Sequence, residues 1–415
     1  MSASPDAGRH DWRRVLFVFW ITSMVEGLGV SQVFAFLPSY LRALGVPEDD
    51  RAAFVGLFSA LIFVVGMPLV PLWGVWADRY SRKAVIARSA LVEAVVFACV
   101  ALSREPWQLA VSMLLIGFQL GNTGVMLGAI RDVVPGRRVG TVIAAFGVAG
   151  PIGFALGPFL GGILIDGLGW SLSSVFWLSG LLSVGTAALV WFGAEEVRPA
   201  VVPTGRILAL AYGAVRGVLT DRAVRRIFLI YGVAFLANQM CRPYQPLIVE
   251  EIVGSGPGLA AAIAVVVGLA SLGGALVSPI GGWVSDRIGF RTVLITALLV
   301  GGIALVAIPL VPTLPPLAVS VFVFTASNAL VGAMVFSLLA TEVPIERRSQ
   351  TLNLVYLPLY AAGIIGPIIG GTLAGRFGPS APFLAGAAVF LVGAVVVALR
   401  LRPRMAGAVA DSPPA

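Results

Sequence analysis

The chain has 415 residues, of which 58% are hydrophobic and only 12% are charged, and its mean hydropathy is +0.97. A soluble protein carries charge on about a quarter of its residues, so this composition excludes a soluble globular fold and indicates an outer surface that faces lipid. The net charge of +8 comes from basic residues in short segments between apolar runs. That pattern is typical of membrane topology and not of a nucleic-acid-binding patch.

Twelve apolar runs are long enough for a membrane-crossing helix, which takes about 20 residues. Each run is far longer than the roughly 10 residues of a transmembrane β-strand, so the sequence predicts an all-α membrane protein. The first run has Glu26 at its middle and is too long for a signal peptide, so we interpret it as a retained span. The predicted spans cover residues 15–38, 52–76, 84–102, 107–130, 140–165, 171–192, 226–249, 259–283, 292–311, 316–340, 350–374 and 381–401.

Basic residues are distributed unevenly between the loops. The two termini and the even-numbered loops hold 23 of the 28 lysine and arginine residues, whereas the odd-numbered loops hold only Arg42, Arg51, Arg104 and Arg376. Loops rich in lysine and arginine stay on the cytoplasmic side. The sequence therefore predicts a multi-pass protein of the inner (plasma) membrane with both termini in the cytoplasm.

The chain contains an internal repeat. GVWADRYSRK at 74–83 returns as GWVSDRIGFR at 282–291, and GPFLGG at 157–162 returns as GPIIGG at 366–371, at offsets of 208 and 209 residues. Because each copy recurs on the same predicted membrane side, the repeat holds an even number of spans, namely six. We predict two parallel six-helix halves, with an N-terminal bundle over 1–192, a cytoplasmic linker with an interfacial helix over 193–225 and a C-terminal bundle over 226–415.

These motifs resemble those of the major facilitator superfamily, and the resemblance covers essentially the whole chain. GVWADRYSRK looks like the family signature after span 2, with Asp78, Arg79 and Arg82 on its fixed positions, and the second copy keeps Asp286 and Arg287. A carboxylate there can face the positive N-terminal end of a helix in the opposite bundle. We expect Asp78 and Asp286 to latch the cytoplasmic side while the outside is open. The alternative is that these charges only anchor loops and set topology.

GFALGPFLGG in span 5 matches the superfamily signature that is associated with export. Small residues at every fourth position let helix backbones approach closely, and proline permits a bend. Gly157 and Pro158, with their second copies Gly366 and Pro367, are therefore predicted to take part in gating, and ordinary close packing is the alternative. Span 4 lacks the arginine that proton-coupled drug exporters of the family usually carry. Either proton coupling uses other groups or the chain lies outside that subgroup.

Three charged residues lie in the middle of predicted spans, namely Glu26, Glu93 and Arg242. An ionised side chain at the bilayer centre costs about 2.5–3.5 kcal/mol, so each is expected to face a cavity or a partner. The resemblance places spans 1, 4, 7 and 10 around a central cavity, so Glu26 is predicted to couple protons or attract a cationic substrate, with a static ion pair as the alternative. Arg242 is predicted either to pair with Glu26 or to bind an anionic group. For Glu93 we favour a buried hydrogen bond inside the N-terminal bundle.

Polar and aromatic residues at helical spacing complete the predicted substrate site. Interhelical hydrogen bonds would place the same polar residues there, so ordinary packing is again the alternative. Besides Glu26 and Arg242, the predicted site residues are Tyr231, Phe235, Asn238 and Gln239 in span 7, Gln119 and Asn122 in span 4, and Asn328 in span 10.

The sequence offers no reactive cluster for catalysis. The only lysine, Lys83, does not follow a glycine, so the sequence contains no phosphate-binding P-loop. The only histidine, His10, lies in the N-terminal tail, which excludes histidine metal sites and histidine triads within the membrane. We predict that the chain is not an enzyme and needs no cofactor.

The resemblance and these residues together predict a secondary active transporter that exports small amphipathic drugs or metabolites against protons by alternating access. The expected partners are a small-molecule substrate, protons and the lipid bilayer, with no nucleic acid, and a monomer is expected because one chain completes the architecture. One alternative is a carrier for a sugar, a carboxylate or a peptide, with Arg242 binding the substrate. Another is a membrane receptor or assembly partner that transports nothing.

Overall fold

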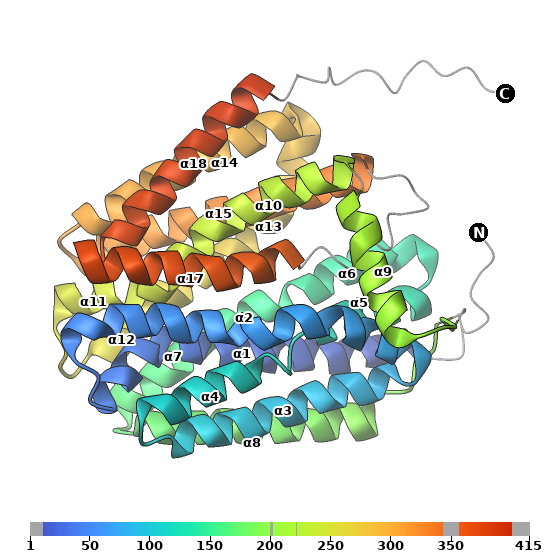
Figure 1. Cartoon of the computed structure of the whole chain (residues 1–415), viewed down its shortest axis with the longest axis horizontal. Coiled ribbons are helices and arrows are strands. Elements are labelled where there is room, and N and C mark those ends of the chain that lie inside the picture. The colour runs from blue at the N-terminus through green and yellow to red at the C-terminus, as the bar shows by residue number, and fades with distance from the viewer. Residues whose placement is uncertain (1–10, 200–201, 221, 343–356, 401–415) are drawn as a thin grey trace.

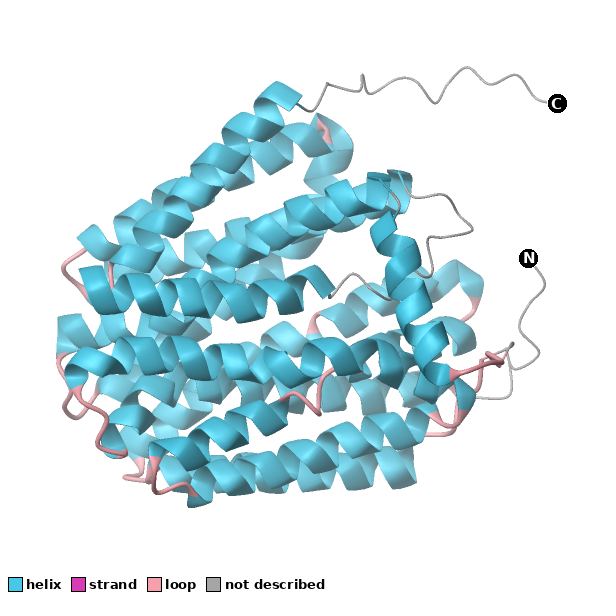
Figure 2. Cartoon of the chain, viewed as in Figure 1, coloured by secondary structure: helices cyan, strands magenta, loops and turns pink. Residues whose placement is uncertain are grey.

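The computed structural model describes residues 11–199, 202–220, 222–342 and 357–400, and every regular element within these ranges is a helix (Figure 2). Short 3₁₀ or π turns extend or link several of the helices. The helices are α1 (Trp12–Ala43), α2 (Glu48–Arg79), α3 (Arg82–Leu102), α4 (Pro106–Ile116), α5 (Asn122–Val133), α6 (Val139–Gly147), α7 (Ala149–Gly162), α8 (Leu172–Gly193), α9 (Ile207–Thr220), α10 (Arg222–Cys241), α11 (Gln245–Val253), α12 (Leu259–Ile263), α13 (Leu269–Ile288), α14 (Phe290–Ala307), α15 (Leu314–Glu342), α17 (Leu357–Phe377) and α18 (Ala381–Arg400).

Ten helices of the described chain are long and apolar enough to cross a membrane, which confirms the predicted all-α membrane fold. The predicted spans 4 and 7 are not among these ten, and each is interrupted. α4 ends at Ile116 and α5 begins at Asn122, after Gly121 with a φ of 102°, a left-handed conformation that suits glycine. In span 7, the 3₁₀ turn Arg242–Tyr244 separates α10 from α11, and Pro243 lacks the N–H that a continuous helix needs. The count of twelve spans stays a prediction.

The helices form two groups that lie side by side, α1–α8 and α10–α18 (Figure 1). α2 packs along α17, and α7 packs against α12 and α13. We call the end where α1 begins at Trp12 and α18 ends at Arg400 the terminal end, and the opposite end, which holds Val46 and Glu250, the distal end. The two groups converge at the distal end and diverge toward the terminal end (Figure 1).

The signature glycines of span 5 bring the backbones of α1 and α7 into contact. A Cβ atom on Gly153 would lie 2.0 Å from the Met24 carbonyl oxygen, and one on Gly157 would lie 2.0 Å from Ser31 Oγ and 2.4 Å from the Leu28 carbonyl oxygen. These distances are too short for any side chain, so only glycine permits this approach. The close packing that the spacing predicts is therefore present, whereas a gating role for Gly157 and Pro158 stays a prediction.

The second copy of this motif packs α17 against α10 in the same way, although less tightly. A Cβ atom on Gly366 would lie 3.0 Å from both Gln239 Cβ and the Leu236 carbonyl oxygen. The carbonyl oxygen of Pro367 accepts a hydrogen bond of 2.9 Å from the hydroxyl of Tyr244, the last residue of the break in span 7. Gly366 and Pro367 thus support the C-terminal group internally.

α9 falls within the predicted linker and lies across the terminal end, between the two groups (Figure 1). It contacts α2 on one side and α10 on the other. The Tyr212 hydroxyl donates a hydrogen bond of 3.0 Å to the Pro68 carbonyl oxygen, inside α2. An interfacial position for α9 and the division of the chain at 193–225 stay predictions.

Candidate functional site

Glu26 is the centre of a polar cluster inside the N-terminal group. Its carboxylate accepts hydrogen bonds from Gln119 Nε2 at 3.2 Å and from Asn122 Nδ2 at 2.9 Å. Both amides are buried, with 1% and 2% of their surfaces exposed. Their spacing predicted that both lie on one face of a continuous helix, and this prediction is wrong because the helix is interrupted between Ile116 and Asn122. The break in span 4 turns both amides toward α1, because Gln119 lies in the break and Asn122 is the first residue of α5.

Arg88 is a further member of this cluster and was not among the predicted site residues. We grouped it with the loop arginines, but it lies in the second turn of α3 and its charge acts on Glu26. Its guanidinium carbon lies 3.6 Å from the ring centroid of Trp73 in α2, and Nη2 donates a hydrogen bond of 2.9 Å to Ser89 Oγ. The described residues contain no direct ion pair between Arg88 and Glu26. A fourth charged residue therefore lies within the spans. Its position six residues after Arg82, inside the predicted span 84–102, could have indicated this.

Glu93 lies on α3 beyond Arg88 and is only 2% exposed. Its side chain faces Ser183 of α8 and Gln119 of the span 4 break. Ser89 Oγ donates a hydrogen bond of 2.7 Å to the Gln119 carbonyl oxygen, which ties the break to α3. Glu93 thus lies inside the N-terminal group, where we expected it, and within range of the charge on Glu26.

Arg242 contacts the opposite group through aromatic rings. Its guanidinium carbon lies 4.5 Å from the ring centroid of Phe34 in α1 and 4.5 Å from that of Phe154 in α7. A cation over an aromatic face is attracted by about 0.5–2 kcal/mol. Glu26 and Arg242 are both described by the structure and form no ion pair with each other, so the predicted pair is absent from this structure.

The other predicted site residues do not hydrogen-bond to Glu26 in the described structure. The rings of Tyr231 and Phe235 lie 4.5 Å apart, as expected for residues on one helical face. Gln239 is 5% exposed and packs on Gly366, and Asn238 is half-buried. Asn328 is 9% exposed, and its Oδ1 has no hydrogen-bond donor. These residues belong to the C-terminal group, so the structure divides the predicted site between the two groups.

An ionic cluster joins the two groups at the distal end. Arg42 and Arg51, from α1 and α2, both pair with Glu250 of α11, the latter at 2.9 Å. Asp166 Oδ2 also accepts a hydrogen bond of 2.7 Å from the Ala261 backbone N–H at the start of α12. Next to Glu250, a cavity of about 590 Å³ is lined by residues of both groups, including Ala52 and Glu48. The distal end is thus held closed by polar contacts.

Removing the shared carboxylate should loosen this closure. We expect Glu250→Gln to favour opening of the distal end by about 1–2 kcal/mol, because two partly buried arginines lose their counter-charge. The measurement is the rate at which a maleimide modifies a cysteine introduced by Ala52→Cys, in purified protein from which Cys99 and Cys241 have been removed. The change in free energy corresponds to a roughly tenfold faster modification.

The matched control is Glu48→Gln. Glu48 lines the same cavity but makes no ion pair in the described structure. An equal labelling rate in Glu250→Gln and Glu48→Gln would show that the ionic cluster does not keep the distal end closed.

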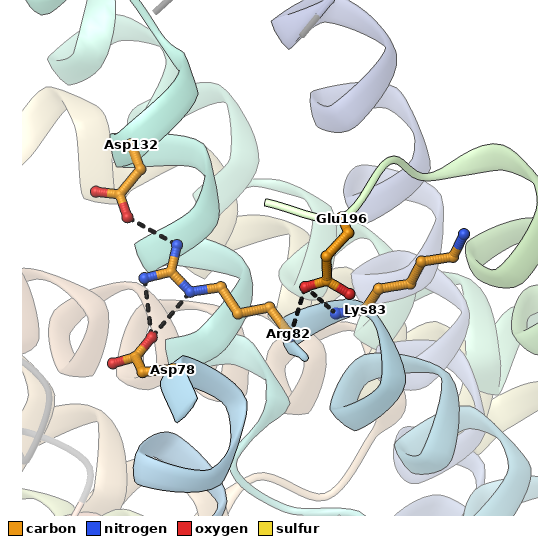
Figure 3. A network of polar contacts seen from close by, with 5 residues as sticks. All are labelled: Asp78, Arg82, Lys83, Asp132 and Glu196. Atoms are coloured by element: carbon orange, nitrogen blue, oxygen red, sulfur yellow. Dashed lines mark hydrogen bonds and ion pairs between the residues drawn. The ribbon is translucent and has the colours of Figure 1, made fainter. Parts of the chain in front are cut away.

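The signature after span 2 forms a polar network within the N-terminal group (Figure 3). Arg82 is 6% exposed, and its guanidinium bonds to Asp78 at 2.9 Å and to Asp132 at 2.7 Å. Glu196 caps the start of α3 by accepting from the backbone N–H of Arg82 at 2.9 Å. Ser81 Oγ also donates to this carboxylate. The network links α2, α3, α5 and the segment after α8.

The contacts that the structure describes for Asp78, Arg79 and Arg287 do not latch the two groups together. Asp78 pairs with Arg82 of its own group, and Arg79 Nη1 donates a hydrogen bond of 2.6 Å to the Gly205 carbonyl oxygen. Arg287 lies 3.8 Å from the ring centroid of Trp283. The side chain of Asp286 lies outside the described residues. The latch is expected in the state that is open to the outside, and its existence stays a prediction.

Glu196→Ala should destabilise the protein by about 1 kcal/mol, the usual cost of losing a side-chain cap at a helix N-terminus. Thermal unfolding in detergent, followed by tryptophan fluorescence, measures this change. Glu196→Gln keeps an acceptor oxygen and should lose less. Equal midpoints for Glu196→Ala and the unmodified protein would show that the cap contributes nothing.

Two packed groups of membrane helices, with charged side chains enclosed at mid-span and polar contacts that close the distal end, define a polytopic membrane transporter. The sequence model of the Major Facilitator Superfamily matches residues 15–226 and 227–414, and the chain belongs to this superfamily. It is therefore a secondary transporter and not an enzyme.

Relatives with this architecture extend over nearly the whole chain. The multidrug resistance protein MdtG of Citrobacter koseri is 27% identical over 405 residues, covering 97% of this chain and 98% of the relative. MdtG of Enterobacter lignolyticus is 26% identical over 394 residues, covering 94% and 93%. The solved structure of the nucleoside transporter NupG aligns with a TM-score of 0.75 at 16% identity, covering 94% of this chain and all of NupG. The human organic anion transporter MFSD10 aligns with a TM-score of 0.67 at 19% identity, with the same coverage. The two structures support the fold alone.

Proposed function

We propose that this transporter exports small amphipathic molecules, with a preference for cations, in exchange for protons that bind at Glu26. The observation that carries the proposal is a mid-span carboxylate held by two buried amides, with the half-buried cation of Arg88 within electrostatic range. A carboxylate enclosed in a span is costly unless its charge is used or neutralised. Binding of either a proton or a cationic substrate neutralises it, and competition between these two ligands is the basis of exchange.

The direction of transport rests on the relatives and on the export signature. The two MdtG relatives are named multidrug resistance proteins, and GFALGPFLGG is the signature that we associated with export. We place the terminal end in the cytoplasm of the cell that makes the protein, with the chain in its inner membrane. The closed distal end then faces outward, and the structure represents the state that takes up substrate from the cytoplasm.

The same proposal includes the organisation of the chain. The units are the bundles 1–192 and 226–415 and the linker 193–225, and one chain acts as a monomer. Rocking of the two groups would break the distal contacts of Glu250 and bring Asp78 and Asp286 toward the opposite group.

A second candidate, transport of an anionic molecule, is favoured by one observation. Arg242 has no carboxylate partner within the described residues, and it lies at the boundary of the two groups. Its two aromatic contacts can be exchanged for an anionic group of the substrate. Arg242→Ala should then abolish transport of an anion such as a lipophilic carboxylate. Under the leading proposal, the same variant should still transport a cation.

Uptake of ethidium into inverted membrane vesicles tests the leading proposal. Acidification of the vesicle interior should drive uptake, and a protonophore should stop it. Vesicles without the transporter provide the baseline. Uptake that is independent of the pH gradient would exclude proton exchange.

A further inference from the structure

Buried polar atoms without hydrogen-bond partners are concentrated around Glu26. Of ten such side-chain atoms in the described residues, six belong to this cluster: Trp73 Nε1, Arg88 Nε, Arg88 Nη1, Glu93 Oε1, Gln119 Oε1 and Asn122 Oδ1. Each unpaired buried group costs about 1–3 kcal/mol. Such a concentration therefore calls for an explanation, and a functional site is one of those that apply.

Glu93 is the member whose position is hardest to explain by packing. A Cβ atom on Gly29 would lie 3.0 Å from Glu93 Oε1, so this oxygen reaches across to α1, three residues beyond Glu26. Ser183 from α8 and Gln119 from the span 4 break also face Glu93, and both are uncharged. Glu26 lies within electrostatic range of Glu93, and Arg88 lies within electrostatic range of Glu26.

The charges of the cluster balance only if one carboxylate holds a proton. With Glu26 and Glu93 both ionised, a single cation at Arg88 leaves one net negative charge inside the bundle. With one proton bound, the cluster is neutral, and two like charges no longer share a site of low dielectric. Two carboxylates coupled in this way bind protons as a pair.

We propose that Glu93 is a second proton-binding residue, which holds a proton while Glu26 is ionised opposite Arg88. Glu26 has two amide donors that stabilise a carboxylate, whereas Glu93 Oε1 has none. A proton on Glu93 also turns a carboxylate oxygen that has no hydrogen-bond partner into a hydroxyl donor. The Oε1 atom of Gln119, whose side chain faces Glu93, also lacks a partner and can accept from it. The inference rests on the proposed function, since it assigns to the same site the residue that keeps the cluster neutral while Glu26 exchanges protons.

Infrared difference spectra of the purified protein test this assignment, because a protonated carboxylic acid has a carbonyl stretching band that a carboxylate lacks. At neutral pH we expect a band in the spectrum of the unmodified protein minus that of Glu93→Gln. The same band should be lost in Glu26→Gln, because a single remaining carboxylate ionises opposite Arg88. The control is Glu105→Gln, which replaces an exposed acid at the start of α4 and should keep the band.

Arg88→Gln gives an independent measurement if Glu93→Gln fails to fold. Without the cation, both carboxylates should bind protons, and the band area should increase about twofold, since two groups then absorb. A difference spectrum without the band, a band that persists in Glu26→Gln, or an unchanged band in Arg88→Gln would each overturn the proposal. These spectra need no transport, so failure of pH-driven ethidium uptake would refute the proposed function separately.

Discussion

Replacement of Glu26 by glutamine should reduce pH-driven ethidium uptake to the level of vesicles without the transporter. Glutamine has nearly the same shape as glutamate and can still accept a hydrogen bond from Asn122 or Gln119, so the protein should fold. It binds no proton near neutral pH and carries no charge to attract a cation. Inverted vesicles with a controlled pH gradient measure the effect directly.

The loss of uptake in Glu26→Gln should affect proton-coupled transport and leave folding intact. A shape-conserving variant of an exposed acid, Glu105→Gln, should transport like the unmodified protein. The thermal midpoint of Glu26→Gln should also stay close to that of the unmodified protein, because the variant removes a buried charge without opening a cavity. Undiminished pH-driven uptake by Glu26→Gln would place proton coupling elsewhere in the chain.

Gly157→Ala should destabilise the protein by about 3 kcal/mol, a large effect for one added methyl group. The new Cβ atom would lie 2.0 Å from Ser31 Oγ and 2.4 Å from the Leu28 carbonyl oxygen, and a helix backbone cannot move without its neighbours. α1 and α7 would have to separate, which would also shift Glu26 relative to the span 4 amides. Thermal unfolding and the yield of monodisperse protein in detergent measure the cost.

The same helix provides a matched control for this substitution. A Cβ atom on Gly150, two turns before Gly157, would have only Ser23 Oγ within 4 Å, at an ordinary contact distance of 3.6 Å. Gly150→Ala should therefore leave the unfolding midpoint unchanged or raise it slightly, because alanine favours a helix more than glycine does. Equal midpoints for the two variants would show that α1 and α7 are not held in direct contact.

Much of the fold and part of the site could be predicted from the chain itself. Apolar runs of about 20 residues admit only helices in a bilayer, because each backbone group must find its partner within its own segment. The cost of burying charge drew attention to Glu26 and Arg242 before any contact was known. The repeat of GPFLGG as GPIIGG predicted the close helix packing at both copies. These features depend on residue type and spacing along a single segment, and the sequence displays both.

Other parts of the site depend on contacts between segments that lie far apart in the chain. Arg88 lies four residues inside the predicted span 84–102, but its role could not be predicted, because only the fold shows that its guanidinium turns inward onto Trp73. The break in span 4 was also missed, since its polar spacing is compatible with a continuous helix until Gly121 adopts a left-handed conformation.

The amino-acid sequence by itself determined the membrane class, the helical character, the internal twofold repeat and the enclosure of a carboxylate within span 1. Hydrophobicity and periodicity are properties of local segments, and the bilayer imposes the same requirement on each. Only the tertiary structure decided which groups surround Glu26, that Arg242 lies between two aromatic rings, and that Glu250 closes the distal end. Those relations follow from how helices pack in three dimensions, where a few ångströms decide whether two charges pair, and no spacing along the chain encodes them.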